Sequence, residues 1–283
     1  MIESSNKLFN LQDDEVHVWT ARFLDDESTT NELVGLLDQN ERARAARFSY
    51  RHHRMRFIHF HAIARQILGG YLGLSAADVT FVHGPHGKPE TKSGRGCADI
   101  QFNLSHSGDY CLLAVRKDHP VGIDLEEVRD LPHALEIAAR QFTHAEAKLL
   151  ARVEDDARRD TFFALWTHKE AVIKALGVSL ANLDRMTFGI DPTGHPQLIS
   201  FDGNRSSDLS LMRLDAPPGY AAALASLHPI PKVMRRTWIG GQDRAPTRRK
   251  ETAGRSQIAA AMSTKVSPLA SEIPQSAADM LFF

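Results

Sequence analysis

One segment of the chain combines a strongly apolar composition with charged side chains, and it constrains the fold more than any other feature. The segment DTFFALWTHKEAVIKALG begins at Asp160, a suitable N-cap, and ends at Gly177, a suitable helix terminator. Residues four apart share a helical face, so Trp166, Glu170 and Lys174 form one row. A helix that is apolar on nearly all sides is usually buried, and buried charges are rarely unpaired. The row is either an ordinary Glu–Lys pair on a solvated stripe or part of a functional interior.

The order of the expected elements indicates two similar halves, because helices are followed by strands twice along the chain. The expected helices cover residues 31–48, 54–73 (ending at Gly69-Gly70), 135–142, 143–153 and 160–177. The expected strands cover residues 15–23, 101–105, 110–116 and 121–126, with further strand pairs within 184–200 and 209–227. Such a duplication would create a cleft between two lobes. We expect the lobes to span residues 1–116 and 117–231.

Charge is distributed unevenly between the body of the chain and its last part. Residues 232–283 hold nine Lys/Arg and four Asp/Glu, a net charge of +5. Residues 1–231 hold 25 and 31, a net charge of −6. A general nucleic-acid binder would need a basic domain, so that class is excluded. The Gly-, Pro- and Ser-rich composition of residues 232–283 predicts a mobile basic extension, which we expect to be dispensable because the chemical motifs lie upstream.

Location and redox state follow from simple absences in the sequence. No apolar run approaches the roughly 18 residues of a membrane span, and the start MIESSNKLFN lacks the layout of a signal peptide. Cys97 and Cys111 allow at most one disulfide and match no metal-ligand spacing. We expect a reduced, cytoplasmic protein that has no membrane partner.

Two carboxylates stand on one face of an expected strand. In VGIDLEEV, the side chains of Asp124 and Glu126 share a face, while Ile123 and Leu125 point into the core. Close carboxylates repel unless a cation or donor intervenes, and Mg²⁺ is held by one or two carboxylates with waters and phosphates. The alternative is an edge strand whose acidic side chains are exposed to solvent.

Two further motifs suit a phosphate group. In FNLSHSGDY, Ser105 and His106 end an apolar strand before Gly108, where hydroxyls, an imidazole and free backbone N–H groups can gather. The G-x-S-x-G nucleophile motif is missing there, and a simple polar turn is the alternative. In GPHGKPE, Lys88 stands on a tight turn, where a lysine serves as a phosphate partner or is merely solvated.

Arginine is concentrated in residues 42–56. The segment contains Arg42, Arg44, Arg47, Arg51, Arg54 and Arg56. No aromatic interleaving suited to base stacking accompanies them, so a small polyphosphate ligand is favoured over nucleic acid. Solvated helix surface is the alternative for most of them.

The motifs in this order resemble those of the Sfp-type 4′-phosphopantetheinyl transferases. The shared pattern is a basic helical segment, G-K-P, N-L-S-H-S, G-I-D-L-E and W-x-x-K-E-x-x-x-K. The resemblance covers roughly residues 15–230 and does not include the tail. It implies an α+β fold, a pseudo-twofold pair of similar lobes with the active site in the cleft between them. It also implies transfer of phosphopantetheine from coenzyme A to a serine hydroxyl of an apo acyl or peptidyl carrier protein, with Mg²⁺ and release of 3′,5′-ADP.

The resemblance also assigns roles to individual residues. Asp124, Glu126 and Glu170 would hold the metal, and Lys174 would reach a phosphate or the reacting hydroxyl. The expected coenzyme A contacts are Ser105 and His106 at the phosphates, and Lys88 with Arg44 or Arg56 at the adenosine and 3′-phosphate end. Glu170, a metal-bound water or Lys174 would accept the serine proton; Lys174 would need a lowered pKa. Trp166 would pack beneath Glu170 and Lys174 as core.

Two rival functions use the same residues. A Mg²⁺-dependent hydrolase would cleave a nucleotide diphosphate with water, and a non-catalytic module would bind coenzyme A or a carrier without turnover. The intact set of Asp124, Glu126, Glu170 and Lys174 argues against the second. We expect a monomer; the carrier and its pathway, whether fatty acid, polyketide or nonribosomal peptide synthesis, stay open.

Overall fold

The computed structural model describes residues 9–91, 99–201 and 209–239, which form two lobes. The first lobe contains β1 (Glu15–Arg22), α2 (Glu27–Val34), α3 (Gln39–Ala45), α4 (Arg51–Leu72), the 3₁₀ turn η1 (Ala76–Asp78), β2 (Phe81–His83), β3 (Pro89–Thr91), β4 (Ile100–Ser107) and β5 (Tyr110–Lys117). The second contains β6 (Val121–Glu127), α5 (Ala134–Gln141), α6 (His144–Arg152), α7 (Asp155–Leu176), η2 (Leu180–Arg185), β7 (Met186–Ile190), β8 (Pro196–Phe201), β9 (Ser210–Arg213) and β10 (Tyr220–Ser226). A last strand, β11 (Lys232–Thr237), follows.

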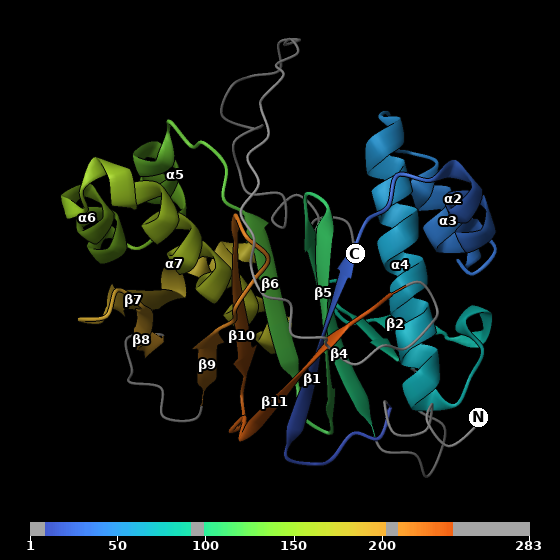
Figure 1. The fold of residues 1–283 in the computed structure, drawn as a ribbon. Coiled ribbons are helices and arrows are strands. Elements are labelled where there is room, and N and C mark those ends of the chain that lie inside the picture. The colour runs from blue at the N-terminus through green and yellow to red at the C-terminus, as the bar shows by residue number, and fades with distance from the viewer. Residues whose placement is uncertain (1–8, 92–98, 202–208, 240–283) are drawn as a thin grey trace, which may run out of the picture.

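Each lobe places a long helix outside a sheet, so the fold is α+β with two lobes. The first sheet has the order β11-β1-β5-β4 and the second has the order β6-β10-β9. Helix α4 packs on the first sheet and α7 on the second, and the helices stand on the two outer sides with the strands between them (Figure 1). Both helices have 22 residues, and both end at a left-handed glycine, Gly73 and Gly177. The two-lobe expectation is confirmed.

A central apolar layer joins the two sheets. It is built from β1 and β5 on one side and β6 and β10 on the other. Its buried members are Val16, Val18, Leu112, Ala114, Val121, Ile123, Leu125, Leu214, Ala222 and Leu224. Ile123 and Leu125 thus point into the core as predicted, because alternate strand residues face opposite sides. Asp124 and Glu126 face away from this layer, toward α7.

Three local predictions need correction. Helix α7 begins at Asp155, with Glu154 at the N-cap position, and not at an N-cap of Asp160. The helix expected over residues 31–48 is broken into α2 and α3, because Asp38 caps a new helix through the backbone N–H of Glu41. Helix α4 does not stop at Gly69-Gly70 but continues to Leu72. A Cβ at Gly69 would lie 2.7 Å from the Leu74 carbonyl oxygen, so that glycine permits a close backbone approach inside the helix.

The predicted start of the mobile extension at residue 232 is also wrong. Strand β11 pairs in parallel with β1, with Glu15 opposite Lys232 and Thr20 opposite Thr237. Trp238 packs against Trp19, with ring centroids 5.9 Å apart. Residues 232–239 therefore complete the first lobe, and the rest of the expected extension lies outside the described residues.

None of the helices in the described ranges is long and apolar enough to cross a bilayer.

Candidate active site

The acidic strand β6 lies directly beneath α7. Asp124 and Glu126 are 0% and 1% exposed, so the exposed-edge alternative for this strand is wrong. Gly122 makes the close packing possible, because a Cβ there would lie 2.1 Å from the Ala171 carbonyl oxygen of α7. A glycine within a strand often marks such an approach of another backbone. Gly122 was not among the predicted site residues, although its position two residues before Asp124 could have indicated it.

Lys174 links the carboxylates of the two elements. Its Nζ lies 2.6 Å from Asp124 Oδ1 and 3.9 Å from Glu170 Oε2, and it donates a 3.2 Å hydrogen bond to Ser105 Oγ. Burial alone would lower the pKa of Lys174, but the Asp124 and Glu170 carboxylates outweigh it and raise the pKa above its ordinary value. Lys174 is therefore an ammonium group here, which argues against its alternative role as the base.

The oxygen-rich donor set suits a hard cation such as Mg²⁺. Asp124 Oδ2 is buried and accepts no hydrogen bond from the described residues. Within that part of the chain, however, no three Asp, Glu, His or Cys side chains converge into a ready ligand cluster. Mg²⁺ needs only one or two carboxylates when waters and substrate phosphates complete its shell. The residues fit a metal held jointly by β6 and a phosphate substrate.

Ser105 and His106 occupy opposite faces of β4. The Ser105 hydroxyl donates to Asp124 Oδ1 at 2.9 Å and accepts from the Leu125 backbone N–H at 3.2 Å. His106 lies on the α4 side, where its ring centroid is 5.2 Å from that of Phe60. The structure therefore brings Ser105, but not His106, to the Asp124–Lys174 pair. Contact of either residue with a phosphate stays a prediction.

Lys88 crosses from the first lobe to the second. It stands at the turn between β2 and β3, and its Nζ donates a 3.0 Å hydrogen bond to the Val121 carbonyl at the start of β6. Burial lowers its pKa to about 8. The ammonium group thus lies at the lobe boundary beside the strand that carries Asp124.

The two candidate arginines lie in different places. The guanidinium carbon of Arg44 lies 5.0 Å from the centroid of the Phe57 ring, and Arg44 lines a pocket of about 390 Å³. The pocket is also lined by Arg47, His61, His83, Phe81, Pro89, Phe102 and Leu104. Arg56 instead bonds Asp109 Oδ1 at 2.6 Å, beside the turn between β4 and β5. Of the two candidates, only Arg44 lines this pocket, whose walls combine basic and aromatic side chains with the carboxylates of Asp38 and Glu41.

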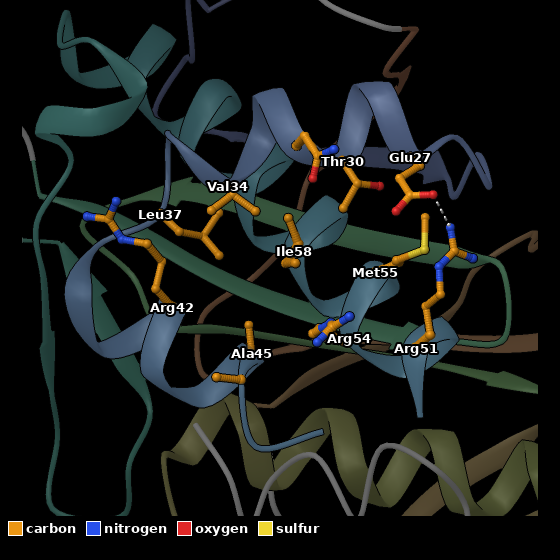
Figure 2. Close-up of a pocket in the computed structure, with 12 residues that line it drawn as sticks. Glu27, Thr30, Val34, Leu37, Arg42, Ala45, Arg51, Arg54, Met55 and Ile58 are labelled. Atoms are coloured by element: carbon orange, nitrogen blue, oxygen red, sulfur yellow. Dashed lines mark hydrogen bonds and ion pairs between the residues drawn. The ribbon is translucent and has the colours of Figure 1, made fainter. Parts of the chain in front are cut away.

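Other arginines of the 42–56 segment surround a second pocket. Figure 2 shows Arg42, Arg51 and Arg54 around an apolar floor between α2, α3 and the start of α4. The pocket measures about 300 Å³, and Arg51 bonds Glu27 across its edge. The arginine cluster is thus divided among three surroundings and does not form one anion site.

Comparisons with known proteins cover both lobes. A family model described as "4'-phosphopantetheinyl transferase superfamily" matches residues 120–225, and one described as "4'-phosphopantetheinyl transferase, N-terminal" matches residues 25–118. The chain is 38% identical over 183 residues to the 4′-phosphopantetheinyl transferase HetI of Nostoc sp., covering 65% of this chain and 77% of HetI.

Two relatives from Bacillus are matched over a greater share of the chain. Identity is 31% over 210 residues to 4′-phosphopantetheinyl transferase psf-1 of Bacillus pumilus, covering 73% of this chain and 87% of that protein. Identity is 28% over 198 residues to 4′-phosphopantetheinyl transferase Sfp of Bacillus subtilis, covering 70% and 85%. Together with the two-lobe fold, these matches show that the chain is an enzyme of the 4′-phosphopantetheinyl transferase superfamily.

Proposed function

We propose that the protein transfers 4′-phosphopantetheine from coenzyme A to a serine hydroxyl of an apo acyl or peptidyl carrier protein, in a Mg²⁺-dependent reaction. The observation that carries the proposal is the buried group of Asp124, Glu170 and Lys174 where β6 meets α7. Phosphoryl transfer depends mainly on positioning and on stabilisation of charge on the phosphate oxygens. Family membership supplies the identity of the transferred group.

The residues divide the chemistry between them. Asp124, Glu126 and Glu170 would hold Mg²⁺, which when bound supplies neutralisation of charge on the diphosphate oxygens. The Lys174 ammonium donates to an oxygen of the transferred phosphate. Glu170 takes the proton of the carrier serine while the serine oxygen forms a bond to the β-phosphorus of coenzyme A. The bond from that phosphorus to the bridging oxygen breaks, and 3′,5′-ADP leaves with the electron pair.

The nucleotide end fits the pocket that Arg44 lines. Its aromatic walls suit a purine, and Arg44 and Arg47 supply positive charge for a 3′-phosphate. Pro89, which also lines it, follows Lys88 directly in the chain, and the Lys88 ammonium itself lies at the Val121 carbonyl on the lobe boundary. His106 lies on the same face of β4 as Leu104 of the pocket wall. We propose a monomer, because one chain supplies both sides of the site. The proposed location is the cytoplasm.

Mass spectrometry of apo carrier proteins after incubation with coenzyme A and Mg²⁺ tests the proposal. The expected result is a gain of one phosphopantetheine group, lost when the carrier serine is replaced by alanine. The Asp124→Asn enzyme, whose side-chain oxygen can still accept from Ser105 Oγ and Lys174 Nζ, should give no product. Release of 3′,5′-ADP without a carrier would instead indicate the hydrolase, and binding of coenzyme A without turnover would indicate the non-catalytic module.

A further inference from the structure

A row of three side chains on β4 takes the place of a strand-to-strand backbone ladder at the boundary between the lobes. Asn103 Oδ1 accepts the Ile123 N–H at 2.8 Å, Ser105 Oγ accepts the Leu125 N–H at 3.2 Å, and Ser107 Oγ accepts the Glu127 N–H at 3.1 Å. The contacts recur every second residue on both strands. They therefore lock β4 and β6 in one parallel register.

The two serines also contact the carboxylates of the proposed metal site. Ser105 Oγ donates to Asp124 Oδ1 at 2.9 Å, and Ser107 Oγ donates to Glu126 Oε2 at 2.9 Å. A hydroxyl has only one proton, so its accepted backbone N–H and its donated carboxylate bond together fix its orientation. Both carboxylates are buried, so a rotamer that broke these hydrogen bonds would cost free energy.

Asn103 provides an internal comparison within the same row. It accepts the backbone N–H of Ile123 in the same way. The residue that precedes Ile123 is Gly122, which has no side chain, whereas a carboxylate residue precedes Leu125 and Glu127. Asn103 therefore serves the register alone, whereas Ser105 and Ser107 serve the register and a carboxylate.

We propose that Ser107, together with Ser105, is a positioning residue: Ser107 holds one oxygen of Glu126 and Ser105 one oxygen of Asp124, and each bond fixes the orientation of its carboxylate at the proposed metal site. The orphaned Oδ2 of Asp124 is the outcome expected of such an arrangement. Partners that orient metal-binding carboxylates typically change metal affinity by about 10- to 100-fold when they are removed. This inference rests on the proposed function only in taking Asp124 and Glu126 as the metal-binding groups.

The test compares Ser107→Ala with Asn103→Ala, each of which removes one hydrogen bond between β4 and a backbone N–H of β6. Amide hydrogen exchange should show lost protection at Glu127 in the first variant and at Ile123 in the second. Mn²⁺ binding, measured by electron paramagnetic resonance with coenzyme A present, should weaken about tenfold in Ser107→Ala and change less than twofold in Asn103→Ala. Ser107→Thr, which keeps the hydroxyl, should restore binding.

Each other outcome counts against the inference. Equal loss of Mn²⁺ affinity in the two alanine variants would show that the row is only structural, and wild-type protein that binds no Mn²⁺ would remove the metal-binding premise. Neither result depends on transfer, which mass spectrometry of the carrier measures separately. If Ser107→Ala does not fold, Ser107→Cys takes its place, because a thiol of similar size is a weak donor.

Discussion

Lys169 Nζ lies 2.8 Å from Glu146 Oε2, and neither side chain exposes any surface to solvent. The ammonium also donates to the Met186 carbonyl at 2.7 Å, while Glu146 accepts the backbone N–H groups of Thr143 and Phe188. One ion pair thus connects α6, α7 and β7. It also explains why α7 carries a charge beside Glu170: Lys169 holds the helix in place, and Glu170 and Lys174 face the site.

Breaking this pair should destabilise the protein strongly. Lys169→Met leaves the Glu146 carboxylate buried without its ammonium, which should lower the free energy of unfolding by about 3–5 kcal/mol. The double variant Glu146→Gln/Lys169→Met should regain part of that loss, because no buried charge remains. Urea unfolding of Lys169→Met, Glu146→Gln and the double variant measures the coupling. A single-variant cost below about 1 kcal/mol, the size of an exposed pair, would contradict this account.

Gly122→Ala should impair catalysis by moving α7. The added Cβ would meet backbone atoms of Ala171 and Ala175 at 2.1 and 2.3 Å, so helix and strand must separate. A displacement of about 1 Å can cost on the order of 100-fold in rate, and we expect kcat to fall by that amount. Gly35→Ala is the control, because Gly35 has an ordinary φ of −62° and lies at the end of α2. Similar kcat values for both variants would contradict the role of Gly122.

Two truncations should separate β11 from the rest of the C-terminal part. Ending the chain after Ile239 should leave the melting temperature nearly unchanged. Ending it after Pro231 removes β11, the 2.6 Å Lys232–Glu15 ion pair and the Trp238 contact with Trp19. A loss of about 3 kcal/mol would lower the melting temperature by roughly 10 °C. Calorimetry of both proteins checks this, and equal melting temperatures would show that β11 adds no stability.

Acid should destabilise the fold through two buried histidines. Burial lowers the pKa of His17 and of His168 from 6.5 to about 4, so both are neutral in the folded protein at pH 6. Between pH 6.5 and 4 the unfolded chain binds protons that the folded chain does not. The free energy of unfolding should therefore fall as pH falls through this window, by up to about 1.4 kcal/mol per pH unit for each histidine. Urea titrations from pH 7 to 4 should show a shallower fall for His168→Gln, and an unchanged slope would contradict the assignment.

Lys88 should make coenzyme A affinity depend on pH above neutrality. Its pKa of about 8 means that the free enzyme loses the ammonium charge as pH rises through 8. If that charge binds phosphate, the dissociation constant should rise about tenfold between pH 7 and 9, since about one tenth of the groups remain charged one unit above the pKa. Calorimetric titration measures this. Lys88→Arg, which stays charged, is the matched control, and a flat wild-type profile would contradict the assignment of Lys88.

Local periodicity predicted part of the site correctly. The alternation of β6 placed Ile123 and Leu125 in the core and the two carboxylates on the other face, and the α-helical repeat placed Glu170 and Lys174 in one row. These relations involve neighbours in the chain. Burial of the acidic face did not follow, because it depends on α7 lying over β6.

Contacts between distant residues could not be read from any local pattern. The partner of Lys169 is Glu146, 23 positions away on another helix, and Lys232 pairs with Glu15 across almost the whole described chain. The Pro-, Gly- and Ser-rich composition beyond residue 231 predicted a mobile extension from residue 232 onward. It did not reveal that KVMRRT finds its hydrogen-bond partners on β1.

The parallel pairing of β11 with β1 has a consequence for synthesis on the ribosome. Strands β1, β4 and β5 leave the exit tunnel early, but one edge of β1 stays open until residues 232–237 have been made. An open strand edge can pair with strands of other chains. A nascent chain or a protein fragment that stops after β5 is therefore prone to aggregate through β1. The first lobe is therefore completed last, and a fragment that stops after β5 lacks the strand that covers the second edge of β1.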